Sequence, residues 1–158
     1  MHMSRSHLTF RARVLSALAM MAILGADSAL RAVPGDAQTD AVVVIVSSAS
    51  PVTEISRLLL TDLYTGRASR FPNGTAAVPI DQRPGSADRA EFSESFLGRS
   101  EAQIKAHWAK IIFTGRGRPP AEVSDGQAVR RLVARDARAI GYVDSRLVDS
   151  TVRIVRVN

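Results

Sequence analysis

Cysteine is absent from all 158 residues, so this chain cannot form a disulfide or use a thiolate as a nucleophile or metal ligand. Histidine is almost as scarce, since His107 is the only one after residue 7. One histidine supplies neither a serine–histidine relay nor a cluster of metal ligands. The composition therefore argues against an enzyme and predicts no catalytic residue, no metal and no cofactor.

Lysine and aromatic residues are also few. Lysine occurs only at Lys105 and Lys110, and aromatic side chains make up 5% of the chain. Residues 1–32 hold four arginines and one aspartate, so the formal charge falls from +6 to +3 without them. The remaining arginines are scattered and are not interleaved with aromatic residues, which indicates a domain that does not bind nucleic acid.

The chain has no apolar run of the length that a bilayer-spanning helix needs, about 20 residues. An uncharged apolar run covers only residues 14–26, after a basic segment and before small and polar residues. That order predicts a signal peptide over residues 1–32, cleaved between residues 28 and 37, then a linker over residues 33–40 and one domain over residues 41–158. We therefore expect a periplasmic or secreted protein without a stable membrane anchor after cleavage. An uncleaved anchor and a buried helix are the alternatives.

Apolar patterning after residue 40 predicts an α/β domain. Continuous or alternating apolar residues predict strands over residues 41–46, 76–80, 139–143 and 152–157. Helical spacing and helix-start residues predict helices near residues 56–65, from Gly85 and Ser86, from Ser100 and from Ser124. The predicted order along the chain is β-α-β-α-α-α-β-β.

Two of the predicted helices start with an S-x-x-Q sequence, which has the form of a capping box. Ser100 and Gln103 form the first, and Ser124 and Gln127 form the second. In the helix after Ser100, residues at helical spacing predict a core-facing stripe made of Ile104, Trp108, Ile111 and Ile112.

Five segments together resemble the phosphate-type substrate-binding proteins of ATP-driven bacterial importers. They are LTDLYTG (60–66), FPNG (71–74), VPIDQRPGSADRAEF (78–92), HWAKIIFTGRGRPP (107–120) and AIGYVD (139–144). The likeness covers residues 42–144 and is strongest to the short, single-lobed relatives of that family. It implies one lobe of a type II periplasmic binding protein, with a central mixed sheet and flanking helices in a three-layer arrangement.

The resemblance also implies where a ligand would bind. The full-length proteins bind phosphate between two lobes, with Ser-Gly-Thr at a helix start and an arginine four residues before that serine. In this chain the serine is Ser86, followed by Ala87 and Asp88. Gln82 stands in the arginine position, and Arg83 lies one residue later.

The helix start at Ser86 is the candidate site for a small oxyanion. Free backbone N–H groups and the positive end of the helix dipole favour an anion there, and Arg83 and Arg89 flank the turn. The alternative is that Ser86 is only an N-cap and Asp88 only a first-turn acid, which are common features of helices.

Two loops add further candidates. Ser47 and Ser48 follow the first strand, and ligands of α/β proteins bind at the carboxyl ends of strands, although serines that only stabilise a turn are the alternative. Arg116 and Arg118 lie in a glycine-rich loop that could recognise an acidic partner. The alternative for this loop is a glycine-terminated helix followed by an extended exit.

The sequence thus predicts an exported, non-catalytic binding protein that holds a small oxyanion such as phosphate in connection with transport or sensing. The alternative is an envelope protein-interaction module that keeps the fold without binding the ligand. The residues predicted to bind the oxyanion are Ser86, Arg83, Arg89, Ser47 and Ser48. The predicted partners are phosphate or a similar small anion and an envelope protein.

Overall fold

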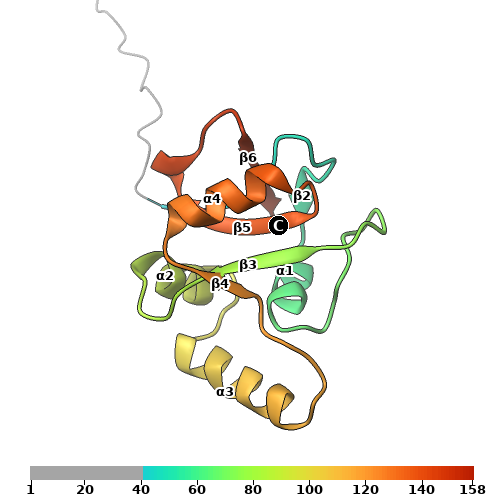
Figure 1. Ribbon diagram of the computed structural model, residues 1–158, viewed down its shortest axis with the longest axis vertical. Helices are drawn as coiled ribbons and strands as arrows, with labels where there is room; N and C mark the ends of the chain where they lie inside the picture. Colours follow the sequence, from blue (N-terminus) through green and yellow to red (C-terminus); the bar gives the residue numbers. More distant parts are fainter. Residues whose placement is uncertain (1–40) are drawn as a thin grey trace, which may run out of the picture. The chain divides into compact units, whose positions relative to one another are not determined.

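A five-stranded mixed sheet with strand order β4-β3-β5-β1-β6 forms the centre of the domain (Figure 1). The computed structural model describes residues 41–158, and the predicted signal peptide and linker lie outside these residues. The strands of the sheet are β1 (Val42–Ser47), β3 (Val78–Gln82), β4 (Ala121–Val123), β5 (Ala139–Asp144) and β6 (Val152–Ile154). A second sheet pairs β2 (Glu54–Ile55) with β7 (Arg156–Val157).

The strands of the central sheet do not all run in the same direction. β3 is parallel to both of its neighbours, β4 and β5. β1 is antiparallel to its two neighbours, with Val42 opposite Asp144 of β5 and Ser47 opposite Val152 of β6. The carboxyl ends of β1 and β3 therefore lie at opposite ends of the sheet.

Helices cover both faces of the sheet, which gives the predicted three-layer arrangement (Figure 1). Successive side chains of β1 alternate between the faces, as they must in an extended strand. Val44 and Val46 belong to the core on the side of α1 (Arg57–Tyr64) and α2 (Ala87–Ser95). Ile45 belongs to the core on the other side, under α4 (Gly126–Arg135).

The approach of α4 to the sheet depends on a glycine in β5. A Cβ atom at Gly141 would lie 2.4 Å from Val129 Cγ1 and 3.1 Å from Val133 Cγ2, both on α4. Because real Cβ atoms do not come as close as 2.4 Å to another carbon atom, a larger residue at this position would push α4 away from the sheet.

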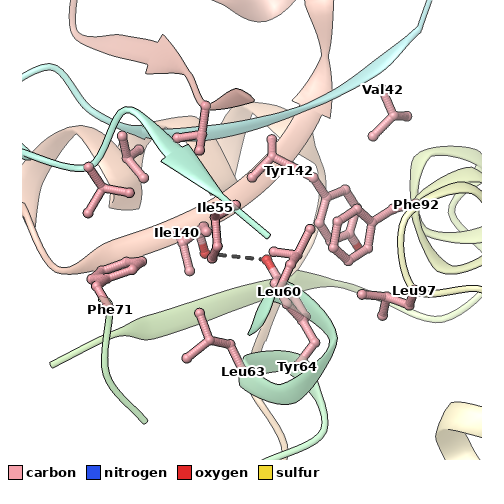
Figure 2. Close-up of a cluster of buried hydrophobic side chains, with 14 of the residues drawn as sticks. Val42, Ile55, Leu60, Leu63, Tyr64, Phe71, Phe92, Leu97, Ile140 and Tyr142 are labelled. Atoms are coloured by element: carbon pink, nitrogen blue, oxygen red, sulfur yellow. Dashed lines mark hydrogen bonds between the residues drawn. The ribbon is translucent and has the colours of Figure 1, made fainter. Parts of the chain in front are cut away.

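Aromatic side chains fill the core beneath α1 and α2 (Figure 2). The rings of Phe92 and Tyr142 are stacked with centroids 3.9 Å apart, and Tyr64 lies against both. The Tyr64 hydroxyl donates to the carbonyl oxygens of Ile80, at 3.0 Å, and Ile140, at 3.3 Å. Burying this hydroxyl therefore leaves no unpaired donor in the core.

The capping box that starts α3 (Glu101–Phe113) is confirmed, and the second predicted box is wrong. Gln103 N donates to Ser100 Oγ at 3.3 Å, and Ser100 N donates to Gln103 Oε1 at 2.9 Å. At α4 the N-cap is Asp125, which accepts from Ala128 N at 2.8 Å. A carboxylate one residue after Ser124 displaces the serine, since aspartate caps helices at least as well.

Replacing Ser100 by alanine is expected to lower the free energy of unfolding by about 1 kcal/mol, because the N-cap acceptor is lost. Ser124→Ala is the matched control and is expected to change it by less than about 0.5 kcal/mol, since Ser124 caps no helix. Urea unfolding of both variants measures the difference. Equal losses would contradict the capping assignment.

Only part of the predicted stripe on α3 is buried. Ile104 and Trp108 are buried and Ile111 is half-buried, but Ile112 is 56% exposed and Phe113 is 92% exposed. Figure 1 shows why, because α3 lies away from the sheet, on the side of β3 and β4, instead of covering a face. A helix that contacts the domain along a narrow line buries fewer side chains than its apolar pattern predicts.

Two features of the sheet differ from the predicted order. The single strand predicted over residues 152–157 is divided at Val155 into β6, which pairs with β1, and β7, which pairs with β2. The sequence does not predict β4, because three residues directly after two prolines are too short a run to indicate a strand. A 3₁₀ turn, η1 (Ser145–Leu147), follows β5. Within residues 41–158 no helix is long and apolar enough to cross a membrane.

Candidate functional site

Ser86 is the N-cap of α2, at the turn that follows β3. Its Oγ accepts from Arg89 N at 3.2 Å and donates to Gln82 Oε1 at 2.8 Å. Both bonds are made within the protein, so the hydroxyl proton is already engaged. Ser86 is therefore an N-cap, as the alternative interpretation of the sequence predicts.

Gln82 lies at the end of β3 and is 2% exposed. Its Nε2 donates to Asp88 Oδ2 at 3.1 Å and to the Tyr142 carbonyl oxygen at 3.3 Å. With the bond from Ser86 to its Oε1, the amide connects the sheet to the first turn of α2. Gln82 therefore acts as an internal connector at the position where the resemblance implies an arginine for phosphate.

Arg89 is also engaged inside the protein. Its side chain is 10% exposed, and its guanidinium lies 3.0 Å from Asp81 Oδ2 and 3.1 Å from Glu122 Oε1. It also donates to the Gln82 carbonyl oxygen at 2.8 Å. Arg89 ties α2 to β3 and to the edge strand β4, and its charge is balanced by two carboxylates.

The Asp81 carboxylate is held by several donors. Besides Arg89, it accepts from Gln82 N at 2.8 Å and from the Tyr142 hydroxyl. Burial raises the pKa of Asp81 above its usual value, although the hydroxyl and the guanidinium act in the opposite direction. Burial and the neighbouring Asp81 charge raise the pKa of Tyr142, which keeps this hydroxyl a neutral donor.

Two more carboxylates lie at the start of α2. Asp88 is the first-turn acid of the helix, and Glu101 Oε2 accepts from Gly85 N at 3.3 Å. These negative charges already interact with the positive end of the helix dipole, where an oxyanion would have to bind. Because like charges repel, Asp88 and Glu101 disfavour the binding of an oxyanion at the start of α2. Within residues 41–158 no three His, Asp or Glu side chains are close enough together to hold a metal ion.

Arg83 is the predicted site residue that remains available at this turn. Its backbone N donates to the Val123 carbonyl oxygen at 2.9 Å, and its side chain is exposed. In the described part of the chain no hydrogen bond or ion pair engages its guanidinium. Of the residues predicted around the helix start, the structure brings Ser86 and Arg89 together and leaves Arg83 in solvent.

Ser47 and Ser48 lie far from this turn. β1 and β3 run in opposite directions, so the serines lie at the other end of the sheet, about 16 Å away along the strands. Ser47 is buried, and its Oγ lies 3.4 Å from the Ala134 carbonyl oxygen, to which it donates, and 3.3 Å from Ala49 N. The structure thus places Ser47 at the end of β1 against α4 and Ser48 in the turn that follows, both separate from Ser86.

Sequence patterns do not predict that Asp81 and Glu122 pair with Arg89. Asp81 follows three mostly apolar residues in a strand, and an ionisable group in a buried strand is a signal that it has a charged partner. Nothing local connects Glu122 with Arg89, which is 33 residues earlier. Nothing local connects Glu101 either with the turn before α2, which it contacts through Gly85 N.

Two pockets lie on either side of the line along which α3 contacts the domain, and Trp108 lines both. One has a volume of about 530 Å³ and includes Asp81, Arg89 and Glu122 among mainly apolar neighbours. The other has a volume of about 570 Å³ and includes the predicted loop residues Arg116 and Arg118.

Solved structures of phosphate-transport proteins share this arrangement of strands and helices. A protein of Clostridium perfringens, described as a phosphate ABC transporter substrate-binding protein and solved with bound phosphate, matches 75% of this chain at 20% identity and a TM-score of 0.59. The domain has the fold of one lobe of such proteins. An ABC-type phosphate transport receptor from Vibrio cholerae (20% identity, TM-score 0.58) and PstS from Borrelia burgdorferi (14%, 0.56) each also match 75% of it.

The match extends over only part of these neighbours. This chain spans 45% of the Clostridium protein, 46% of the Vibrio receptor and 47% of the Borrelia protein, less than half of each. At identities of 20% or lower the likeness is one of fold. No protein-family model and no curated protein matches the sequence.

Proposed function

We propose that this domain is a non-catalytic protein-interaction module of the bacterial envelope, which keeps the lobe fold without holding phosphate at the start of α2. The observation that carries this proposal is that the groups aimed at that position are engaged within the protein. Ser86, Gln82 and Arg89 are all bonded to protein atoms. Asp88 and Glu101 add negative charge where an anion would bind.

The proposed location rests on the sequence. The basic, apolar and small-residue order of residues 1–32 is that of a signal peptide, which would deliver the domain to the periplasm or the exterior. The absence of cysteine suits an exported domain equally well, since no thiol is left to oxidise there.

A second candidate function is the binding of a small oxyanion such as phosphate. Two observations favour it: the Clostridium neighbour was solved with phosphate, and Arg83 is exposed beside the helix start with its guanidinium unengaged in residues 41–158. An ion bound to Arg83 and to the first backbone N–H groups of α2 would remain in contact with solvent, where screening weakens charge interactions over about 8 Å.

Titration calorimetry with phosphate and with sulfate separates the two functions. For the unaltered protein we expect dissociation constants weaker than about 1 mM, equivalent to less than about 4 kcal/mol. Asp88→Asn removes one charge and keeps a side-chain oxygen for Gln82 Nε2, so it is expected to strengthen phosphate binding measurably.

The matched control is Arg83→Ala, which removes the available guanidinium and leaves the internal bonds untouched. Micromolar phosphate binding by the unaltered protein that is abolished in Arg83→Ala would contradict the proposed interaction module and support the oxyanion-binding function. Dynamic light scattering with and without phosphate shows whether a second copy takes part.

A further inference from the structure

The second pocket described above, which we call the arginine pocket, lies at the amino ends of β3 and β4, away from Ser86. It has a volume of about 570 Å³. Its walls come from the end of α1, the segment that leads into β3, the inner side of α3 and the loop before β4. The lining residues used below are Arg67, Arg116, Arg118, Trp108, Ile111 and Val78.

Positive charge dominates this pocket. Three arginines line it, all are exposed, and no aspartate or glutamate is among the lining residues. Arg67 is paired with Asp62 at 2.7 Å. For Arg116 and Arg118, no side-chain hydrogen bond or ion pair is present among residues 41–158. Unlike Arg89, these two guanidinium groups carry charge that no carboxylate of the described domain balances.

The backbone that carries these arginines is held in place. Gly115 N donates to the Ile112 carbonyl oxygen at 3.0 Å, and Arg116 N donates to that of Ile111 at 3.1 Å, so the loop leaves α3 in a fixed direction. Pro119 and Pro120 restrict the chain that follows, up to β4. A loop that is already ordered loses little conformational entropy when it binds a partner.

The arginines of the pocket come from two separate segments, which suits an elongated partner better than a single compact ion. Arg116 and Arg118 are two residues apart in a segment that is neither helix nor strand. Arg67 follows α1, and the apolar residues Val78 and Ile111 also line the pocket.

We propose that the arginine pocket binds an extended, acidic segment of a partner protein, with carboxylates that face Arg116 and Arg118. This deepens the interaction function proposed above by giving the chemistry of the partner. The carboxylates make charge-assisted hydrogen bonds to the guanidinium groups. Apolar side chains of the segment lie against Ile111, which lines the pocket and is half-buried.

Fluorescence anisotropy with the purified full-length protein tests this. The probe is a labelled peptide in which glutamate alternates with valine, and its control is the same peptide with glutamine in place of glutamate. We expect the glutamate peptide alone to bind, and the double variant Arg116→Ala, Arg118→Ala to bind it about tenfold more weakly. The control variant Arg131→Ala, Arg135→Ala removes the same charge from the exposed surface of α4 and is expected to weaken binding less than about twofold.

Equal weakening by the two double variants would overturn the proposal, because net charge alone would then explain the binding. No binding of the glutamate peptide, or binding only to vesicles of anionic phospholipid, would overturn it as well. Displacement of the peptide by millimolar phosphate would make the pocket a small-anion site instead. Phosphate binding that depends on Arg83 would contradict the proposal that the start of α2 holds no phosphate, whereas peptide binding depends on Arg116 and Arg118, so the two failures are distinguishable.

Discussion

Replacing Arg89 by alanine is expected to lower the free energy of unfolding by about 3–5 kcal/mol at neutral pH. The side chain is 10% exposed and balances Asp81, which is equally buried, and it also pairs with Glu122 at the surface. Removing one partner of a buried ion pair leaves the other charge without compensation. Urea unfolding followed by far-ultraviolet circular dichroism measures the loss.

The loss in Arg89→Ala is expected to shrink as the pH falls. The raised pKa of Asp81 means that the folded state holds this proton more tightly than the unfolded state does. Stability contributed by protonated Asp81 is therefore present at low pH and lost as the pH rises through the raised pKa. Without Arg89 that pKa rises further, so acid solution neutralises the uncompensated carboxylate and the variant approaches the unaltered protein.

Two variants test this explanation. Arg83→Ala removes the same charge from an exposed side chain in the same segment, and a change within about 0.5 kcal/mol is expected. Combining Asp81→Asn with Arg89→Met removes both charges and is expected to recover part of the loss, as a double-mutant cycle would reveal. A pH-independent loss in Arg89→Ala would show that packing, and not the ion pair, is what Arg89 contributes.

Trp108→Ala is expected to lower the free energy of unfolding by about 3–5 kcal/mol, the range for a buried tryptophan replaced by alanine. Trp108 is 7% exposed, and its Nε1 donates to the Tyr64 carbonyl oxygen at 3.2 Å. A Cβ atom at Gly66 would lie 2.7 Å from Trp108 Cη2, so the indole rests directly on the backbone after α1. Trp108 therefore holds α3 to the rest of the domain.

The matched control is Phe113→Ala on the same helix, where the ring is 92% exposed and a change within about 0.5 kcal/mol is expected. Circular dichroism is the appropriate signal because Trp108 is the only tryptophan. Trp108→Ala should also weaken binding of the glutamate peptide, since the indole lines the arginine pocket. Similar losses in the two variants would contradict the role of Trp108 as the attachment of α3.

Local patterns in the sequence predicted the layers of the fold. The continuous apolar run of β1 predicts a strand buried on both faces, and Val44 and Ile45 do face opposite cores. The S-x-x-Q sequence at Ser100 predicts its capping box because every group involved lies within four residues. The S-x-x-Q sequence at Ser124 forms no capping box, because the neighbouring Asp125 is the N-cap of α4.

The candidate site was less predictable, because its contacts join distant parts of the chain. Tyr142 and Asp81 are 61 residues apart, and the pairing of β4 with β3 brings Glu122 to Arg89. Ser47 looked like a ligand residue because it ends a strand, but the strand direction that separates it from Ser86 cannot be known from β1 alone. The structure therefore places Arg89 in a buried ion pair at the carboxyl end of β3. It places Arg116 and Arg118 in a pocket at the amino end of the same strand.

The pairing of β1 with β5 and β6 affects how the domain folds during its synthesis. Val42 pairs with Asp144 and Ser47 pairs with Val152, so both neighbours of β1 are synthesised roughly 100 residues after it. No partial chain that stops before β5 can complete the middle of the sheet, and such long-range pairing slows folding. A nascent chain built in this order cannot complete its central sheet until almost all of it has left the ribosome.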